Sequence, residues 1–282
     1  TGITIKYKNK AGTLQQQTQV LAFGTETTAT TTYAGLTLYV PANGSTNVDV
    51  YVDLTSVGTG AGASGASGAI SFDWNEGFNA TGDSGTAVTT VGSADLTNNT
   101  FYVRKSKPTF AKLDGGTAPT AKLFRFSAVA DNAGNIDIKQ LAFDVVTSGC
   151  DITAMRLFDV DGNALTTTTV NPTGNASSGD ASLLVGAVDD TVETISTTAK
   201  IYEVKGTVTG FSTTAGDSIT VSFKQDTSAG ATIDALTAGA DGTWASNEGN
   251  IWSDRSASAH TTATADWTNG FLLKDMTTSQ SF

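Results

Sequence analysis

The sequence predicts an all-β protein made of two tandem immunoglobulin-like β-sandwich domains, the first lacking its opening strand or strands. In Val48–Leu54 and Phe124–Ala130 apolar residues alternate with others, which is the pattern of a half-buried strand. Asn-Gly and Asp-Gly pairs, as at Asn43-Gly44 and Asp161-Gly162, supply tight turns. No stretch shows a helical stripe of apolar residues. Many short strands with regular turn signals are typical of sandwiches and barrels.

Four segments recur in the same order along the chain, which indicates two copies of one structural unit. We therefore expect an N-terminal domain at 1–107, a C-terminal domain at 108–275 and a tail at 276–282. The matched pairs are 3–14 with 152–165, 47–55 with 201–209, 69–74 with 218–223, and 99–105 with 269–275.

The two copies differ at their start. Residues 108–150 precede the first matched segment of the second copy, whereas only Thr1 and Gly2 precede it in the first. Within 108–150 the alternation predicts an opening strand and then a long hairpin with its turn at 131–135. The first domain is therefore expected to lack these opening strands.

The composition favours an extracellular protein. Charged residues make up 15% of the chain and the formal net charge is −11, so the surface is polar but sparsely charged and acidic. Nucleic-acid binding needs clustered positive charge, which this acidic chain does not show. The short basic run at 104–107 is expected to be a solvated strand end. No apolar run reaches the about 20 residues of a membrane span. The single cysteine, Cys150, is expected to be a small buried residue, with an intersubunit or reactive thiol as the alternative.

The sequence gives little support to catalysis. The single histidine, His260, lies in a polar loop and is expected at the surface. Nucleophilic catalysis needs a nucleophile, a base and a group that orients the base, and no such set stands out. Acidic pairs such as Asp189-Asp190 are common by chance in an acidic chain. We therefore expect no enzymatic activity.

Calcium is the only metal that the sequence favours. Asp159, Asp161 and Asn163 resemble the start of a calcium loop, and oxygen donors suit a hard cation. The glycine comes too early for an EF-hand, so a plain hairpin turn is the alternative reading. The same two readings apply to residues 131–135. One cysteine and one histidine make a zinc site improbable in this chain.

Two features bear on glycans. Trp252 and Trp267 flank a loop and are expected to pack beneath it, and Trp74 is expected in the core. The alternative is an aromatic platform for sugars, which would make the protein a cell-surface adhesin or carbohydrate-binding module. Possible glycosylation sites, each starting an Asn-x-Ser/Thr sequence, are Asn43, Asn79, Asn98 and Asn175.

One segment carries a resemblance to a known group of proteins. Trp252-Ser253-Asp254, His260 and the run 266–270 resemble a C-terminal signature of repeat-containing, surface-layer-like proteins of uncultured candidate-phylum bacteria with small genomes. Residues 103–109 resemble the junction that leads into each repeat of such proteins. The resemblance implies a β-sandwich protein of the cell surface and brings no catalytic residues with it.

Together these features predict a structural subunit of an extracellular filament or surface layer. A sheet that lacks a strand exposes unpaired backbone groups and an apolar groove, and a strand from a neighbour can fill both. We expect the tail to be that strand, with Met276, Ser279 and Phe282 in the contact. The expected partner is a second copy of the chain, joined head to tail, with glycans or a host surface as further partners.

Overall fold

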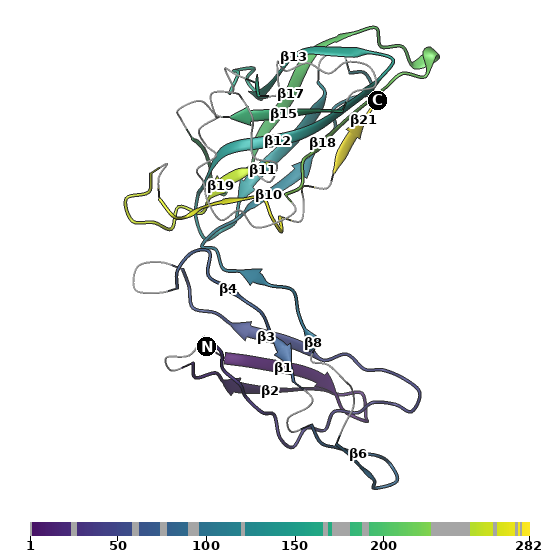
Figure 1. Ribbon diagram of the computed structural model, residues 1–282, viewed down its shortest axis with the longest axis vertical. Coiled ribbons are helices and arrows are strands. Elements are labelled where there is room, and N and C mark those ends of the chain that lie inside the picture. Colours follow the sequence, from purple (N-terminus) through teal and green to yellow (C-terminus); the bar gives the residue numbers. More distant parts are fainter. Residues whose placement is uncertain are drawn as a thin grey trace. The chain divides into compact units, whose positions relative to one another are not determined.

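A computed structural model shows that the protein is all-β, with several antiparallel sheets (Figure 1). Among the residues that it describes there is no α-helix, and a 3-10 turn lies at Thr213–Ala215. The described residues are 2–23, 27–57, 62–73, 78–89, 96–119, 122–165, 169–170, 181–187, 192–226, 249–261, 264–273, 276 and 278–282.

The chain divides into two compact units. The N-terminal unit comprises Thr1–Ser56, Gly60–Gly62 and Ser67–Tyr102, and the C-terminal unit comprises Val57–Thr59, Ala63–Ala66 and Val103–Phe282. The division falls at 102–103, so the basic run at 104–107 and the tail at 276–282 both belong to the C-terminal unit.

The N-terminal unit contains one three-stranded antiparallel sheet in the order β2-β1-β3. Ile3, Ile5 and Tyr7 of β1 alternate with exposed or half-buried residues and are buried. The strands are β1 (Gly2–Lys8), β2 (Leu14–Val20) and β3 (Asp49–Asp53); short pairs add β4 (Ser67–Gly68) with β9 (Phe101–Tyr102), β5 (Ser71–Phe72) with β8 (Leu96–Thr97), and β6 (Ala80–Thr81) with β7 (Ala87–Val88).

The C-terminal unit contains two larger sheets. One has the order β10-β11-β17-β13, with β10 (Pro108–Lys112), β11 (Phe124–Ala130), β17 (Lys200–Thr209) and β13 (Asp151–Asp159). The other has the order β14-β15-β12-β18-β21, with β14 (Thr169–Val170), β15 (Ala181–Ala187), β12 (Ile136–Ser148), β18 (Ser218–Phe223) and β21 (Ser279–Ser281). Along β12 this sheet also holds β16 (Glu193–Ile195) and β19 (Ile251–Ser253), and β19 pairs with β20 (Trp267–Asn269).

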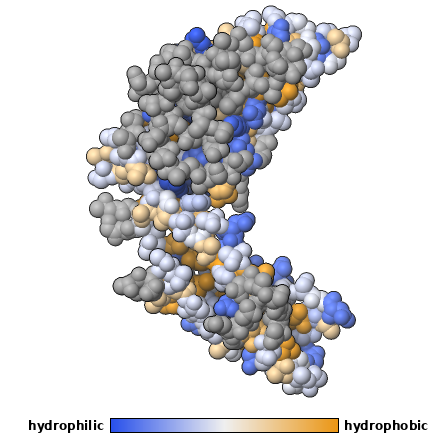
Figure 2. All heavy atoms as spheres, viewed as in Figure 1, coloured by the Kyte–Doolittle hydropathy of each residue, from blue (hydrophilic) through white to orange (hydrophobic). Residues whose placement is uncertain are grey.

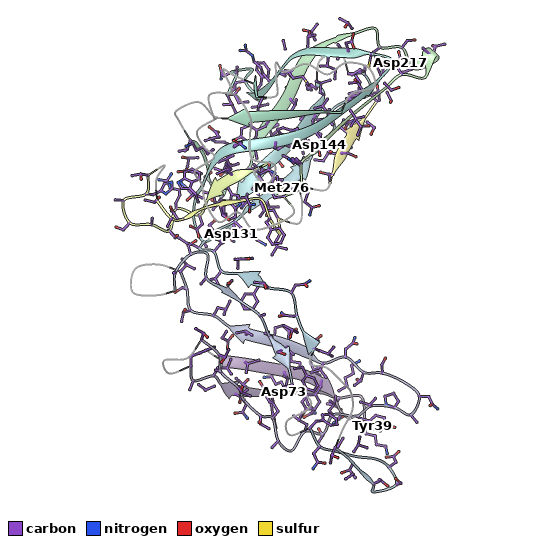
Figure 3. The ribbon with its side chains drawn as sticks, in the orientation of Figure 1. Tyr39, Asp73, Asp131, Asp144, Asp217 and Met276 are labelled. Atoms are coloured by element: carbon purple, nitrogen blue, oxygen red, sulfur yellow. The ribbon has the colours of Figure 1, made fainter. Side chains whose placement is uncertain are left out.

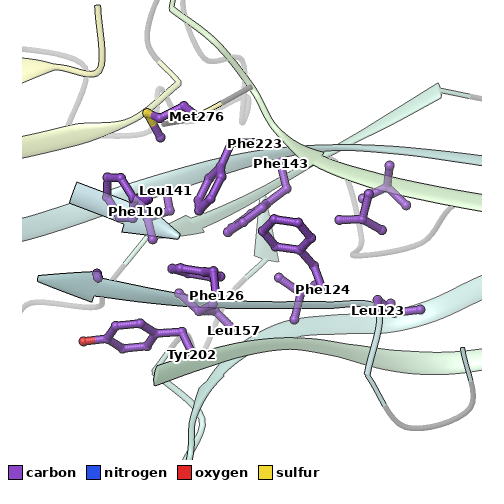
Figure 4. Packing of buried hydrophobic residues seen from close by; sticks show 14 of the residues in the cluster. Phe110, Leu123, Phe124, Phe126, Leu141, Phe143, Leu157, Tyr202, Phe223 and Met276 are labelled. Atoms are coloured by element: carbon purple, nitrogen blue, oxygen red, sulfur yellow. The ribbon is translucent and has the colours of Figure 1, made fainter. Parts of the chain in front are cut away.

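The core of the C-terminal unit lies between these two sheets (Figure 4). Phe126 of β11 lies 5.8 Å, ring centre to ring centre, from Phe143 of β12 and 4.8 Å from Phe223 of β18. All three rings are buried. A buried aromatic side chain removes a large apolar area from water, so these contacts between sheets dominate the packing. Cys150 is buried as predicted.

The first two sequence matches correspond to the same local structure. β1 pairs with β3, and β13 pairs with β17, antiparallel in both cases. The turns that follow β1 and β13 also agree: Gly12 N–H donates to the Asn9 carbonyl (2.9 Å), and Gly162 N–H donates to the Asp159 carbonyl (3.2 Å). Both glycines have positive φ, of 79° and 89°, which a residue with a side chain rarely adopts.

The fourth match does not share a fold. Phe101 lies on strand β9, whereas Gly270–Leu272 form a turn after β20. The fourth match therefore does not mark a strand shared by both segments. The turn forms because the Gly270 N–H donates to buried Asp226, and the Leu273 N–H donates to the Gly270 carbonyl (3.1 Å).

The expected hairpin in 108–150 is also wrong. β11 and β12 follow each other across the turn at 131–135, marked by Asp131 in Figure 3, but they lie in different sheets. We call β11, this turn and β12 the β-arch. The reason lies in burial, because long β12 is covered on both faces over much of its length. Such a strand belongs in the middle of a sheet, where β15 and β18 flank it.

The tail lies in its own unit. β21 pairs antiparallel with β18, with Val221 opposite Gln280, and the Phe282 N–H donates to the Ile219 carbonyl (2.9 Å). Met276 is fully buried in the core (Figure 4). The sequence analysis assigned the tail to the sheet of a neighbouring subunit, whereas in this structure it occupies the edge of β18 in its own unit.

Candidate functional site

The open edge of the N-terminal sheet is the first candidate site. Among the described residues β3 is an edge strand, paired with β1 alone. Val50 lies opposite Ile5 and so on the same face of the sheet. Ile5 is 8% exposed, whereas Val50 is 43% exposed and Val48 is 40% exposed. The face that β1 buries is therefore exposed at Val48 and Val50, whereas Val52, opposite Ile3, is half-buried.

The C-terminal unit shows what covers the corresponding strand. β17 matches β3 in sequence and has β13 on one side and β11 on the other. Val204 and Tyr202 of β17 lie opposite Phe124 and Phe126 of β11, and both are almost fully buried. Burial and a hydrogen bond to Glu193 raise the pKa of the Tyr202 hydroxyl. Among the described residues, no strand covers Val48 and Val50 in the way that β11 covers β17.

The sequence match and the strand register place the same side chains of β3 on the core face. The match places Val52 at the position of Gly206, whereas the β1–β3 and β13–β17 registers place it at Val208. The two alignments differ by two residues. Because side chains alternate with a period of two, this shift leaves the same side chains on the core face.

A second open position lies at β5, which matches β18. In the C-terminal unit β18 is flanked by β12 and β21, and its Val221 is fully buried. Among the described residues of the N-terminal unit, β5 forms a two-stranded sheet with β8, and Phe72 of β5 is 51% exposed. Val50 of β3 and Phe72 of β5 are thus both exposed apolar residues. Figure 2 shows orange apolar residues at the visible surface of the molecule.

The signature segment, residues 251–276, forms the second candidate site. Asp254 is fully buried and accepts hydrogen bonds from the Lys105 N–H (2.8 Å), the Ser64 hydroxyl (2.7 Å) and the Ser256 N–H (3.1 Å). Ser106 is also buried, and its hydroxyl donates to the Gly134 carbonyl (2.6 Å). The side chains of Lys105 and Lys107 are exposed, as predicted for a solvated basic run, whereas the signature segment and the β-arch turn hold the backbone of this run.

His260 lies between two buried carboxylates and is not at the surface as expected. Its Nδ1 lies 2.9 Å from Asp266 Oδ2, and its Nε2 lies 3.0 Å from Asp137 Oδ2. Arg255 donates to Asp137 with distances of 2.8 and 3.0 Å. Burial raises the pKa of Asp266, but hydrogen bonds from Thr264 and from the backbone, together with the charge of His260, outweigh it and lower that pKa. This cluster fixes the loop of the signature segment to β12.

The two tryptophans of the signature segment pack beneath that loop, as predicted. Trp252 is 5% exposed and its indole donates to the Asn269 carbonyl (2.9 Å). Trp267 is 4% exposed and its indole donates to the Thr261 carbonyl (2.9 Å). The aromatic platform that would support sugar binding is therefore not formed by this pair. Trp74 lies outside the described residues.

The predicted calcium ligands form a turn. Asp159 accepts from the Asn163 N–H and from the Asn163 side chain, both at 2.8 Å, and these bonds lower its pKa. Asp161 is exposed beside them. In the second predicted place, Asp131 accepts from the Ala133 N–H (2.9 Å). Among the described residues no group of three or more His, Cys, Asp and Glu side chains is placed to hold a metal ion. Calcium at Asp159 stays a prediction.

The predicted glycosylation sites lie on the surface where they are described. Asn43, Asn79 and Asn98 are exposed, and Asn175 lies outside the described residues. Asn43 occupies a turn with a φ of 55°. The side-chain Oδ1 of Asn98 accepts a hydrogen bond from the Ile70 N–H (2.6 Å). Modification at any of these sites stays a prediction.

The tail residues lie together on the C-terminal unit. Met276 is buried, Ser279 is exposed, and Phe282 packs half-buried against the core. The buried carboxylates that organise the signature segment, by contrast, were not singled out as site residues from the sequence. Asp254 and Asp266 could have been identified only by their place in the signature sequence.

Comparison with known proteins finds no matching family model, no similar curated protein and no similar solved structure. In the part of the chain that the structure describes, no helix is long and apolar enough to cross a membrane.

Proposed function

We propose that this protein is a structural subunit of an extracellular filament or surface layer, built from tandem immunoglobulin-like sandwich units. Neighbouring subunits are joined by β-strand complementation at the N-terminal unit. The observation that carries the proposal is the open β3 edge, where Val48 and Val50 are 40% and 43% exposed. An uncovered, apolar sheet edge is a strong site for pairing with another chain.

Three further observations support this proposal. The chain is polar but sparsely charged, as suits an extracellular surface. Within the C-terminal unit, buried Asp254 holds the backbone at Lys105, where the chain enters this unit. The signature that resembles surface-layer-like proteins thus has a mechanical role in this fold. Its histidine and acids lie in one cluster of close polar contacts around buried Asp137 and Asp266, an arrangement suited to holding a loop in place.

The tail provides one route to a homopolymer. β21 would leave β18 of its own unit and pair with β5 of the next molecule, the strand that matches β18. This exchange would replace contacts of the same kind, as in domain swapping. It would also withdraw Met276 from the core, so the exchange carries a barrier.

Electron microscopy of the purified chain over a range of concentrations tests the proposal. We expect ordered fibres or sheets from the wild type, and single particles from a Val48→Lys, Val50→Lys double variant. Val88→Lys is the matched control, because Val88 is also exposed, at 38%, but lies on β7 away from the β3 edge. Single particles from the wild type at every concentration would contradict self-assembly.

A further inference from the structure

Strand β2 forms a sheet edge that carries no charge. Among the described residues it pairs with β1 alone, so that one side of β2 is an open edge (Figure 1). Its seven residues, LQQQTQV, include neither a charged side chain nor a proline, which are two of the devices that keep an exposed edge from pairing with another chain. The side chains of β2 therefore present no charge that would repel a further strand.

The two ends of β2 are apolar and exposed. Leu14 is 63% exposed and Val20 is 78% exposed, the two highest values among the large apolar residues in the described part of the chain. Gln17 lies opposite buried Ile5 of β1 and so belongs to the core face of the sheet. Leu14 and Val20 lie three residues to either side of Gln17, so both belong to the outer face.

The backbone groups of β2 alternate between its two sides. The Asn9 N–H donates to the Thr13 carbonyl (3.0 Å) at the end of the β1–β2 ladder. In an antiparallel ladder every second pair exchanges hydrogen bonds, so the odd-numbered residues of β2 direct their backbone N–H and C=O groups to β1. The even-numbered residues direct theirs to the open edge, and these are Leu14, Gln16, Thr18 and Val20.

We infer that β2 of one molecule pairs antiparallel with β2 of a second copy of the chain, about a two-fold axis at Gln17. In this register Leu14 lies opposite Val20 of the second copy, and Val20 lies opposite its Leu14. Gln16 lies opposite Thr18 in the same way. The outward backbone groups then bond to one another, because even-numbered residues meet even-numbered ones. The contact joins two three-stranded sheets into one continuous sheet.

The self-complementarity of β2 identifies a second copy as the partner. Each apolar end covers the other, and the polar side chains between them are uncharged on both strands. The opposite edge of the sheet, β3, does not offer this, because pairing two copies of β3 would bring Asp49 and Asp53 together. Pairing between identical edges is therefore favoured at β2.

This contact goes beyond the proposed assembly, because it uses a different edge and closes on itself. An isologous contact places the same strand on both sides and so ends at two copies, whereas head-to-tail complementation at β3 continues. One strand pair buries less area than a standard interface, so we expect a weak dimer whose population rises with concentration.

Cysteine cross-linking of the full chain tests the register. Gln17→Cys places two thiols opposite each other on the axis, in a pair without hydrogen bonds whose Cα atoms are about 4.5 Å apart, a distance that a disulfide spans. Gln19→Cys is the matched control, because Gln19 is also half-buried on the core face but lies about 13 Å along the strand from its own counterpart. Oxidised glutathione serves as the oxidant. The wild type is the blank, because Cys150 is buried.

We expect Gln17→Cys to form a disulfide-linked dimer at least about tenfold faster than Gln19→Cys. Equal rates for the two variants would overturn the register. Absence of the linked dimer from Gln17→Cys would overturn the contact.

A pair of charge variants tests the same contact without an added thiol. Gln16→Lys with Thr18→Lys sets lysine opposite lysine across the axis, whereas Gln16→Lys with Thr18→Glu sets lysine opposite glutamate. Both variants lose the same contact between the hydroxyls of Thr4 and Thr18 (2.7 Å), so they are matched within the fold.

Sedimentation over a concentration series measures the dimer Kd of these variants. We expect the lysine–lysine variant to raise Kd at least about tenfold, and the lysine–glutamate variant to stay within about threefold of the wild type. Equal weakening in the two variants, or no weakening in either, would overturn the inference.

Cross-linking in the Val48→Lys, Val50→Lys background separates this contact from the filament. Unchanged cross-linking of Gln17→Cys supports a contact that does not need the β3 edge, and lost cross-linking would overturn it. Fibres without linked dimers would refute the β2 contact and leave the proposed function in place. Linked dimers without fibres would leave the contact in place and refute the filament.

Discussion

The contrast between Val204 and Val50 gives a direct test of the open edge. The sequence match aligns these two valines, and each is replaced by alanine in turn. Val204 is fully buried in the aromatic core of its unit, whereas Val50 is 43% exposed on β3. The same chemical change thus removes the same two methyl groups from a closed core and from an open edge.

The expected losses of unfolding free energy differ because Val204 lies in a closed core, whereas Val50 does not. At Val204 the lost transfer free energy is about 1.6 kcal/mol, and the cavity left behind brings the total to about 2–3 kcal/mol. At Val50 part of the side chain is already in water and no closed cavity forms, so we expect less than about 1 kcal/mol. For a unit of this size the Val204 change lowers Tm by about 5–10 °C.

Hydrogen exchange over a urea series measures both effects in one molecule. Amides of β17 report on the C-terminal unit, and amides of β1 report on the N-terminal unit. A cost at Val50 equal to that at Val204 would refute the reasoning, because it would mean that the β3 edge is covered. Val146→Ala, exposed at 47% on β12, serves as the control within the C-terminal unit.

Three further predictions concern the buried and hydrogen-bonded acids. Asp254→Ala leaves two backbone N–H groups and a hydroxyl without their acceptor, so we expect the free energy of unfolding to fall by about 3 kcal/mol or more. The control is Asp161→Ala at an exposed site, where we expect a loss of less than about 0.5 kcal/mol in thermal unfolding. Equal losses in the two variants would contradict the role of Asp254. Burial raises the pKa of Glu203, but Lys205 and Lys122 outweigh burial and lower that pKa. The ion pairs of Glu203 therefore stabilise the folded unit above about pH 4, and this stability is lost as the pH falls through the folded pKa. An acid unfolding profile that is unchanged in Glu203→Gln would count against this prediction. We expect Asp159→Ala to lower Tm slightly, and by the same amount with and without a calcium chelator, because its carboxylate accepts the hydrogen bonds that close a turn. A loss of stability seen only when calcium is present would instead establish a calcium site.

Much of the local structure could be predicted from the sequence. Alternation located β11 and β17, and the paired glycines Gly12 and Gly162 located two turns of the same kind. The matched segments also identified β3 as the counterpart of β17. These features are local, because strand alternation and positive φ at glycine depend on neighbouring residues alone.

The role of the signature segment depended on contacts between distant residues. Arg255 and Asp137 are 118 positions apart, and Lys105 and Asp254 are 149 apart. Whether a carboxylate is exposed or buried among donors is set by loops that return from elsewhere in the chain. For this reason His260, read from its polar neighbours as a surface residue, lies between two buried acids.

The sequence predicted an all-β chain and the first two pairs of matched strands, β1 with β13 and β3 with β17. The fold placed β11 and β12 in different sheets and seated the tail on the edge of β18. The physical reason is that a strand's alternation specifies which face is buried, whereas its partners are set by whichever free edge and apolar face the rest of the fold presents.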